Sequence, residues 1–192
     1  MSSSSGIFFL IVGNSGSGKD TLLRWAAERW PEDMPPLLAT HRYITRPSSP
    51  ETEDFISVSP DEFKDMAEQG AFVLQWISYD LYYGVPKDIE DHLAQGNPVI
   101  ANVSRDIIPE AREKFPNVKV IFVSVPYEIL EERITARGRE TDKDIDSRLA
   151  RAQENQELPN ADFVVENVGA PEEGGQKLLD ILISAVKEQA GN

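Results

Sequence analysis

The chain has 192 residues, of which 40% are hydrophobic, and this length fits one globular domain with a buried core. Its formal net charge of -14 at pH 7 disfavours nucleic acid and anionic membranes as partners, because their phosphates repel an acidic surface. The absence of cysteine excludes disulfides, thiolate metal sites and a cysteine nucleophile.

No apolar run in the sequence approaches the roughly 20 residues that a membrane-spanning helix needs. Residues 2–5 are all serine and lack the basic and then apolar pattern of a secretory signal. We therefore expect a cytoplasmic protein.

The first predicted strand, Ile7 to Val12, is followed by a glycine-rich loop and an amphipathic helix. Gly13, Gly18 and Lys19 have the spacing of a loop whose backbone N–H groups surround the β-phosphate of a nucleotide at a helix N-terminus. Glycine leaves space for the phosphate, and Lys19 supplies a cation that bridges the β- and γ-phosphates during transfer. We therefore predict a catalytic Lys19 and an ATP-binding loop. Its residues are Gly13, Asn14, Ser15, Gly16, Ser17, Gly18, Lys19, Asp20 and Thr21.

Asp20 stands where such loops usually have a serine or threonine whose hydroxyl binds Mg²⁺. A carboxylate oxygen also suits this hard cation. Asp20 therefore binds the metal directly or through water, or Thr21 takes part of this role, and the sequence leaves both possibilities open. In either case we expect Mg²⁺ to accompany ATP.

After the loop, apolar runs alternate with amphipathic segments. We expect further strands at 37–40, 71–77, 98–103, 118–125 and 163–165. We expect helices at 21–29, 59–70 (opened by a Ser59–Glu62 capping box), 86–95, 109–115, 126–136 and 172–186, and one more capped by 141–144. Residues 41–47 lead into a polar loop at 48–54, and residues 81–86 form a turn into the helix at 86–95.

Alternating strands and helices after a glycine loop predict an α/β fold of the P-loop kinase type, an open parallel sheet with helices on both faces. We expect a single domain over residues 1–192. Its core is formed by residues of about 6–39, 97–136 and 152–192. Residues of about 40–96 do not fit one strand plus one helix, so we interpret them as an inserted substrate-binding lobe, and the arginine-rich stretch of about 137–151 as a lid.

Eight arginines of this acidic chain fall in short segments, which favours recognition of a small polyanion in a local cationic pocket. They are Arg42, Arg46, Arg105, Arg133, Arg137, Arg139, Arg148 and Arg151. Arg42 and Arg46 lie in a loop-like stretch. Arg133, Arg148 and Arg151 are also consistent with helix-surface arginines paired with nearby acids.

Polar residues follow the buried strand predicted at 98–103. Asn102, Ser104 and Arg105 lie at its carboxyl end, the edge where open α/β sheets bind ligands. Neither of the two histidines, His41 and His92, belongs to a Ser–His or Cys–His candidate pair. The chemistry predicted for the site is therefore positioning and charge neutralisation of phosphates.

These motifs resemble those of the guanylate kinase superfamily over nearly the whole chain. The resemblance rests on the glycine loop, Tyr43-x-Thr45-Arg46, Gln75-Trp76, Tyr83-Gly84 and the lid pair Arg137 and Arg139. Guanylate kinases read guanine with a Glu before that Trp, a Ser or Thr after the Tyr-Gly, a Ser near the Tyr-x-Thr-Arg element and an Asp past the third strand. The corresponding residues here are Gln75, Val85, Arg42 and Ser104. These replacements remove the polar partners of guanine, so guanylate is not the expected acceptor.

The chain is more similar to the ribose 1,5-bisphosphate phosphokinase family, whose members use ATP to make 5-phosphoribosyl 1-diphosphate. The similar segments, one of which contains Asp20, are 16–20, 41–46, 81–85, 102–105, 137–140 and 148–152. The resemblance implies a step of phosphonate breakdown that supplies phosphoribosyl diphosphate for nucleotide and NAD synthesis. It implies ATP with Mg²⁺ and a small phosphorylated sugar as partners, without nucleic acid or membrane.

On this resemblance we expect Arg137 and Arg139 to close over the transferred group as catalytic residues, together with Lys19. The acceptor would be bound by Arg42, Arg46, Gln75, Tyr83, Asn102, Ser104, Arg105 and Arg148. Its 1-phosphate oxygen is already anionic, so no strong general base is required. Two alternatives stay open: another small-molecule kinase, such as a guanylate or sugar kinase, and an inactive guanylate-kinase-like module that binds a phosphorylated partner.

Overall fold

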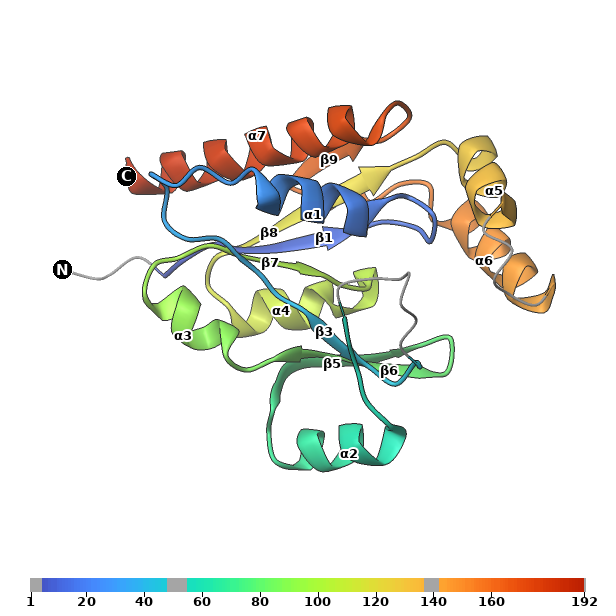
Figure 1. Ribbon diagram of the computed structural model, residues 1–192, viewed down its shortest axis with the longest axis horizontal. Coiled ribbons are helices and arrows are strands. Elements are labelled where there is room, and N and C mark those ends of the chain that lie inside the picture. Colours follow the sequence, from blue (N-terminus) through green and yellow to red (C-terminus); the bar gives the residue numbers. More distant parts are fainter. Residues whose placement is uncertain (1–4, 48–54, 137–141, 192) are drawn as a thin grey trace. The chain divides into compact units, whose positions relative to one another are not determined.

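A computed structural model of the chain describes residues 5–47, 55–136 and 142–191, with the backbone alone for residues 142–144. The expected polar loop at 48–54 lies outside these ranges. The chain divides into two compact units, one made of Met1–Leu10 and Pro31–Lys119 and the other of Ile11–Trp30 and Val120–Asn192. Strand β1 (Phe8–Val12) contributes residues 8–10 to the first unit and residues 11–12 to the second (Figure 1).

In the first unit, β7 (Val99–Asn102) lies between β1 and β2 (Leu38–Ala39). Strand β2 runs parallel to β7, with Leu38 opposite Val99. All four residues of β7 are buried, as expected for a parallel strand that is covered on both faces. The helices of this unit are α2 (Pro60–Glu68), α3 (Ile89–Ala94), α4 (Ile108–Lys114) and the short 3-10 helix η1 (Arg105–Ile107).

The first unit also contains a second sheet, which lies within the segment expected to form the inserted lobe. Its strand order is β4 (Phe55–Ser57), β3 (Arg42–Ile44), β6 (Leu81–Pro86) and β5 (Phe72–Ser78). Strands β3 and β4 are parallel, whereas β6 is antiparallel to both β3 and β5. Helix α2 lies on one face of this sheet (Figure 1). The ring of Phe63 in α2 stacks there on that of Phe72, with 4.6 Å between centroids.

The expected turn at residues 81–86 is wrong, because these residues form strand β6 and helix α3 begins only at Ile89. Strands β5 and β6 form a hairpin with Ser78 opposite Leu81. The two turn residues, Tyr79 and Asp80, have φ values of 50° and 59°, the left-handed conformation that tight hairpins require. The hairpin was missed because neither turn residue is the usual glycine or asparagine.

Strand β8 (Val118–Ser124), of which residues 120–124 belong to the second unit, lies between β1 and β9 (Phe163–Glu166), and β8 and β9 are parallel. Helices α1 (Lys19–Glu28) and α7 (Pro171–Ala190) run side by side (Figure 1). Their close approach depends on Gly175, because a β-carbon there would lie 2.6 Å from the ring of Trp25. Glycine at this position therefore allows α1, the first helix of the unit, to pack closely against α7, the last.

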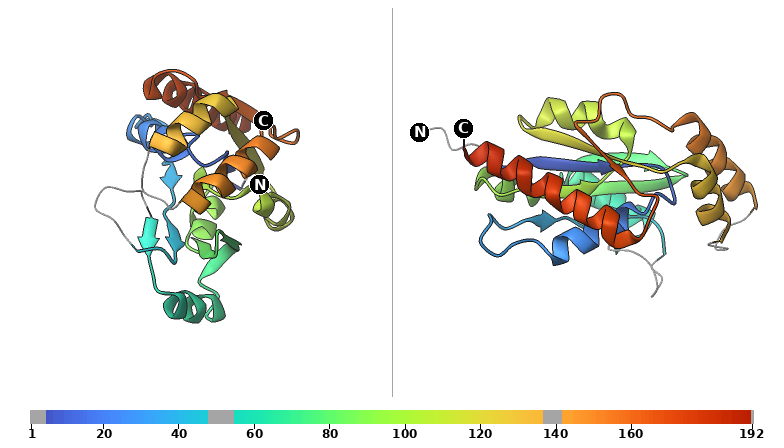
Figure 2. Two further views of the ribbon diagram at one scale, coloured as in Figure 1. Left: turned by 90° about the vertical axis from the view of Figure 1, so that its right-hand side faces the viewer. Right: turned by 90° about the horizontal axis from the view of Figure 1, so that it is seen from above.

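Helices α5 (Tyr127–Ala136) and α6 (Asp142–Glu154) form a second packed pair in this unit, as both views of Figure 2 show. Leu130, Ile134 and Ala152 are buried between them. No helix in the described ranges is long and apolar enough to cross a membrane. The expected α/β fold, a parallel sheet flanked by helices, is confirmed.

Candidate active site

The glycine-rich loop connects β1 to α1, as the sequence predicts. The N–H of Ser17 donates to the carbonyl of Asn14 at 3.1 Å, which closes a tight turn inside the loop. Gly18 is the N-cap of α1 and has a φ of 86°, in the left-handed region where glycine is favoured. The loop therefore ends directly at the N-terminus of α1, which favours anions.

Lys19 folds its ammonium group over this loop. Its Nζ donates to the carbonyl oxygens of Gly13 at 2.8 Å and Asn14 at 3.0 Å, and lies 3.4 Å from the hydroxyl of Ser17. These partners belong to the start and the middle of the loop, so the ammonium connects both parts. The arrangement places a positive charge at the loop, where the sequence predicts the nucleotide phosphates.

Protein neighbours crowd the loop glycines, among them Gly13 and Gly16. A β-carbon on Gly13 would lie 2.7 Å from the carbonyl oxygen of Val123 in β8. A β-carbon on Gly16 would lie 3.1 Å from Ile134 in α5. Packing thus favours glycine at both positions, and at Gly16 so does a φ of 81°. The motif alone reveals neither constraint.

Helix α6 is joined to the loop by two side chains. The Asn14 amide nitrogen donates to the carbonyls of Asn155 at 2.9 Å and Ala152 at 3.4 Å, at the C-terminal end of α6. Arg148 of α6 donates to the hydroxyl of Ser15 at 3.0 Å. Arg148, which was expected to bind the acceptor, therefore lies at the predicted ATP loop. The other expected lid arginines, Arg137 and Arg139, lie outside the described residues.

Asn167 was not singled out in the sequence and contacts the same loop. It directly follows β9, is only 5% exposed, and donates its amide nitrogen to the carbonyl of Ser17 at 2.8 Å. The available sequence signal was a polar residue at the carboxyl end of a predicted parallel strand, where such sheets bind ligands.

The expected metal ligands, Asp20 and Thr21, lie in the first turn of α1, where Asp20 is half-buried and Thr21 exposed. The described residues contain no cluster of three or more His, Asp or Glu side chains that could form a protein-only metal site. Mg²⁺ bound with nucleotide phosphates needs just one or two protein oxygens and keeps several waters. This pair therefore fits magnesium bound together with ATP, and both alternatives for its ligand remain.

In the first unit, Arg42, Tyr83 and Trp76 share one face of the second sheet. The rings of Trp76 and Tyr83, which are opposite each other on β5 and β6, stack with centroids 5.3 Å apart and 6° between their planes. The guanidinium of Arg42 on β3 lies 6.0 Å from the ring of Tyr83. All three side chains are half-buried. They form an aromatic surface with a cation at one side, hereafter the Arg42–Tyr83–Trp76 face.

Gln75 lies on the opposite face of the same sheet. It is exposed and pairs with Gly84. A β-carbon added at Gly84 would point at the ring of Phe72 and not toward Tyr83. Successive residues of a strand alternate between faces, so Gln75 and Trp76 point to opposite sides. The structure does not bring Gln75 together with Tyr83 and Arg42.

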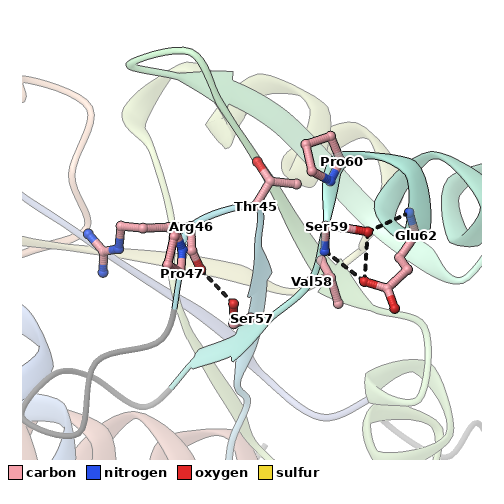
Figure 3. Close-up of a pocket in the computed structure, with 8 residues that line it drawn as sticks. All are labelled: Thr45, Arg46, Pro47, Ser57, Val58, Ser59, Pro60 and Glu62. Atoms are coloured by element: carbon pink, nitrogen blue, oxygen red, sulfur yellow. Dashed lines mark hydrogen bonds between the residues drawn. The ribbon is translucent and has the colours of Figure 1, made fainter.

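Arg46 lines a pocket of about 420 Å³ beside the N-terminus of α2 (Figure 3). Its guanidinium lies 4.8 Å from the ring of Phe55. The predicted capping box closes one side of the pocket, because the Ser59 N–H donates to the Glu62 carboxylate at 2.8 Å and the Glu62 N–H donates to the Ser59 hydroxyl at 3.2 Å. Hydrogen bonds from the backbone and then the hydroxyl of Ser59 lower the pKa of Glu62 below its usual value. The cap therefore favours an ionised carboxylate at this helix end.

Asn102, Ser104 and Arg105 follow β7 as expected. Asn102 is 6% exposed, and Arg105 begins η1. Ser104 caps η1, since its hydroxyl donates to the carboxylate of Asp106 at 3.0 Å and lies 3.5 Å from the N–H of Asp106. Part of the hydrogen-bonding capacity of Ser104 is therefore used within the turn.

Comparison with known proteins shows that the chain is similar to one enzyme family over most of its length. The family model of guanylate kinase matches residues 7–185. A ribose 1,5-bisphosphate phosphokinase PhnN of Thiobacillus denitrificans is 40% identical over 182 residues, which cover 95% of each chain. The enzyme of the same name from Acidiphilium cryptum is 43% identical and covers 93% of each chain. A crystal structure of guanylate kinase from Anaplasma phagocytophilum superposes with a TM-score of 0.68, at 20% identity over 96% of this chain and 88% of that one, and supports the fold.

Proposed function

Because the chain belongs to the guanylate kinase family, and within it to the ribose 1,5-bisphosphate phosphokinases, we propose that it transfers the terminal phosphoryl group of ATP to ribose 1,5-bisphosphate. The observation that carries this proposal is 40% identity over 95% of both chains. The glycine loop with its bound lysine ammonium supports the kinase chemistry. ATP as donor suits a reaction in the cytoplasm.

Two positions argue against guanylate as the acceptor. Val85 stands where guanylate kinases have a serine or threonine, and its apolar side chain is fully buried. Ser104 stands where they have an aspartate, and its hydroxyl already bonds within the cap of η1. A guanine at this site would leave polar groups without partners, which discriminates strongly between substrates.

In the proposed reaction, an oxygen of the acceptor's 1-phosphate attacks the γ-phosphorus of ATP. The bond from that phosphorus to the β,γ-bridging oxygen breaks, and ADP leaves with the electron pair. No proton must be removed, because the attacking oxygen is already anionic. Catalysis then depends on positioning and on neutralising charge.

The residues of the loop bind the phosphoryl donor, ATP, in this proposal. The ammonium of Lys19 neutralises charge on the β- and γ-phosphates, and the backbone N–H groups at the start of α1 bind phosphate oxygens. Asp20 and Thr21 would hold Mg²⁺, which would neutralise further phosphate charge. Arg148 supplements this set from α6 because it already contacts Ser15.

We assign the acceptor to the inserted lobe and to the core residues at the end of β7. Arg42, Arg46 and Arg105 supply cations for the two sugar phosphates, while Tyr83 and Asn102 add polar contacts. On the Arg42–Tyr83–Trp76 face we include Trp76 in place of Gln75. The proposed domain thus consists of a core, the lobe at about 40–96 and a lid at about 137–151. The lid carries Arg137 and Arg139.

The test is an acceptor assay with the purified chain, ATP and Mg²⁺. Ribose 1,5-bisphosphate and guanylate are supplied in parallel, and phosphorus NMR detects the diphosphate of the product. We expect turnover of the ribose bisphosphate. Turnover of guanylate alone would make the chain a guanylate kinase, and failure to bind ATP would favour the inactive binding module.

A further inference from the structure

Asn167 is a buried polar residue that belongs to no sequence motif of the proposed site. It lies between β9 and α7, and 150 positions separate it from Ser17, whose carbonyl accepts its amide proton at 2.8 Å. Its own backbone N–H donates to the carbonyl of Ser124 at 2.9 Å, which fixes it to the end of β8. The side chain therefore extends from the carboxyl ends of β8 and β9 to the glycine loop.

Glycines enclose the Asn167 amide on two sides. A β-carbon on Gly18 would lie 2.6 Å from its nitrogen, and one on Gly174 would lie 2.8 Å from its oxygen. Both glycines thus leave the space that this amide occupies. Because a carbonyl oxygen only accepts, the nitrogen and not the oxygen of the amide must face Ser17.

We propose that Asn167 is a positioning residue that sets the phosphate-binding shape of the loop by holding the peptide between Ser17 and Gly18. The peptide unit is planar and trans, so its C=O and N–H point in opposite directions. With the Ser17 carbonyl held toward Asn167, the N–H of Gly18 points away from Asn167. This N–H lies at the N-cap of α1 and is one of the donors for the nucleotide phosphates. The assignment rests on the proposed ATP-binding role of the loop.

The test uses Asn167→Asp in the full chain. An ionised carboxylate accepts but does not donate, so it faces the Ser17 carbonyl without a hydrogen bond and repels it. We expect binding of MgATP and of inorganic tripolyphosphate, both measured by calorimetry, to weaken by about tenfold, as for loss of one buried hydrogen bond. Tripolyphosphate has no base, so its parallel loss assigns the effect to the loop.

Protonation of the introduced carboxyl restores a donor. The affinity of Asn167→Asp relative to wild type should therefore recover as the pH falls toward the carboxyl pKa. Asn167→Ser, whose side chain is shorter and does not titrate, should lose the same affinity without this pH dependence. If the aspartate variant does not fold, Asn167→Ser still tests the expected loss of affinity. A purely structural asparagine would give no such difference between the two variants.

Asp162→Ala is the matched control. Asp162 lies at the other end of β9, where it accepts a hydrogen bond from the Val120 N–H at 2.7 Å. This variant should lose stability but bind ATP as the wild type does. Equal weakening by Asp162→Ala, or normal tripolyphosphate binding by Asn167→Asp, would overturn the assignment. Failure of the wild type to bind ATP would instead remove the proposed function on which it rests.

Discussion

Replacement of Gly18 by alanine should damage both the stability of the fold and the binding of ATP. Gly18 has a φ of 86°, and a left-handed conformation costs a residue with a β-carbon about 1 kcal/mol. The new β-carbon would also lie 2.6 Å from the Asn167 amide nitrogen. That nitrogen can retreat only by breaking its hydrogen bond to Ser17, which adds about 1 to 2 kcal/mol. The expected total loss is about 2 to 3 kcal/mol of unfolding free energy.

Gly70 provides the control for the conformational part of this loss. It follows α2 with a φ of 70°, and among the described residues nothing lies within 4 Å of the position of a β-carbon. Gly70→Ala should therefore lose only about 1 kcal/mol and leave the KM for ATP unchanged. The difference between the two variants measures the steric part at the loop.

Urea denaturation gives the unfolding free energies of both variants, and steady-state kinetics at saturating acceptor gives the KM for ATP. We expect Gly18→Ala to raise that KM by about tenfold, because the Ser17–Gly18 peptide moves with the displaced amide. Equal stability losses at Gly18 and Gly70, with no change in KM, would refute the claim that Asn167 fills this space.

Further predictions concern the cation, the acceptor surface and the helix cap. Lys19→Ala should lower kcat by about 100- to 1,000-fold, because a positioned cation is lost at the transition state. Lys114→Ala loses a comparable hydrogen bond from a lysine to the carbonyl of Val73 and should not lower kcat. Equal losses of kcat in steady-state assays of the two variants would contradict the role of Lys19. Trp76→Ala should raise the KM for the acceptor several-fold and leave the KM for ATP unchanged. Ile77→Ala, at a 62% exposed position on the opposite face of the sheet, should change neither KM value. An equal effect of the two substitutions on the acceptor KM would remove Trp76 from the site. The pKa of Glu62, followed by NMR, should lie below its usual value and return part of the way in Ser59→Ala, which removes the hydroxyl hydrogen bond but keeps the larger backbone one. The stability that this carboxylate gives the cap is present above its unfolded pKa and is lost as the pH falls through the lowered pKa. An unchanged titration in the variant would contradict the contribution of the Ser59 hydroxyl.

Elements that are determined by residues adjacent in the sequence could be predicted from it. The apolar runs of β7 and β8 and the glycine loop before α1 each depend on neighbouring residues, so their patterns survive in the sequence. The capping box at Ser59 and Glu62 is local in the same way, and both of its predicted hydrogen bonds are present. These patterns can therefore be recognised without knowledge of the tertiary contacts.

Strand β6 was misassigned in part because the reason for its glycine is nonlocal. Gly84 is needed because the ring of Phe72 lies 2.6 Å from the position of a β-carbon. Phe72 belongs to the neighbouring strand and is itself stacked on Phe63 of α2. A glycine that makes room for a distant ring looks the same in the sequence as a glycine in a turn.

The candidate acceptor site shows a different limit. Resemblance to guanylate kinases selected Gln75, yet the register that pairs it with Gly84 places it on the face opposite Tyr83. A shift of one residue along a strand moves a side chain to the other face. Residue type alone therefore could not decide between Gln75 and Trp76, and the pairing with β6 was needed.

The loop that carries the proposed chemistry is shaped by residues outside its own motif. Arg148 connects it to α6, and Asn167 connects it to the end of β9. A relative could keep every residue from Gly13 to Thr21 and still lose the loop conformation if these partners were replaced. An intact motif is thus a weaker criterion for an active kinase than the motif together with its supports. This chain has both, which favours catalysis over the inactive binding module.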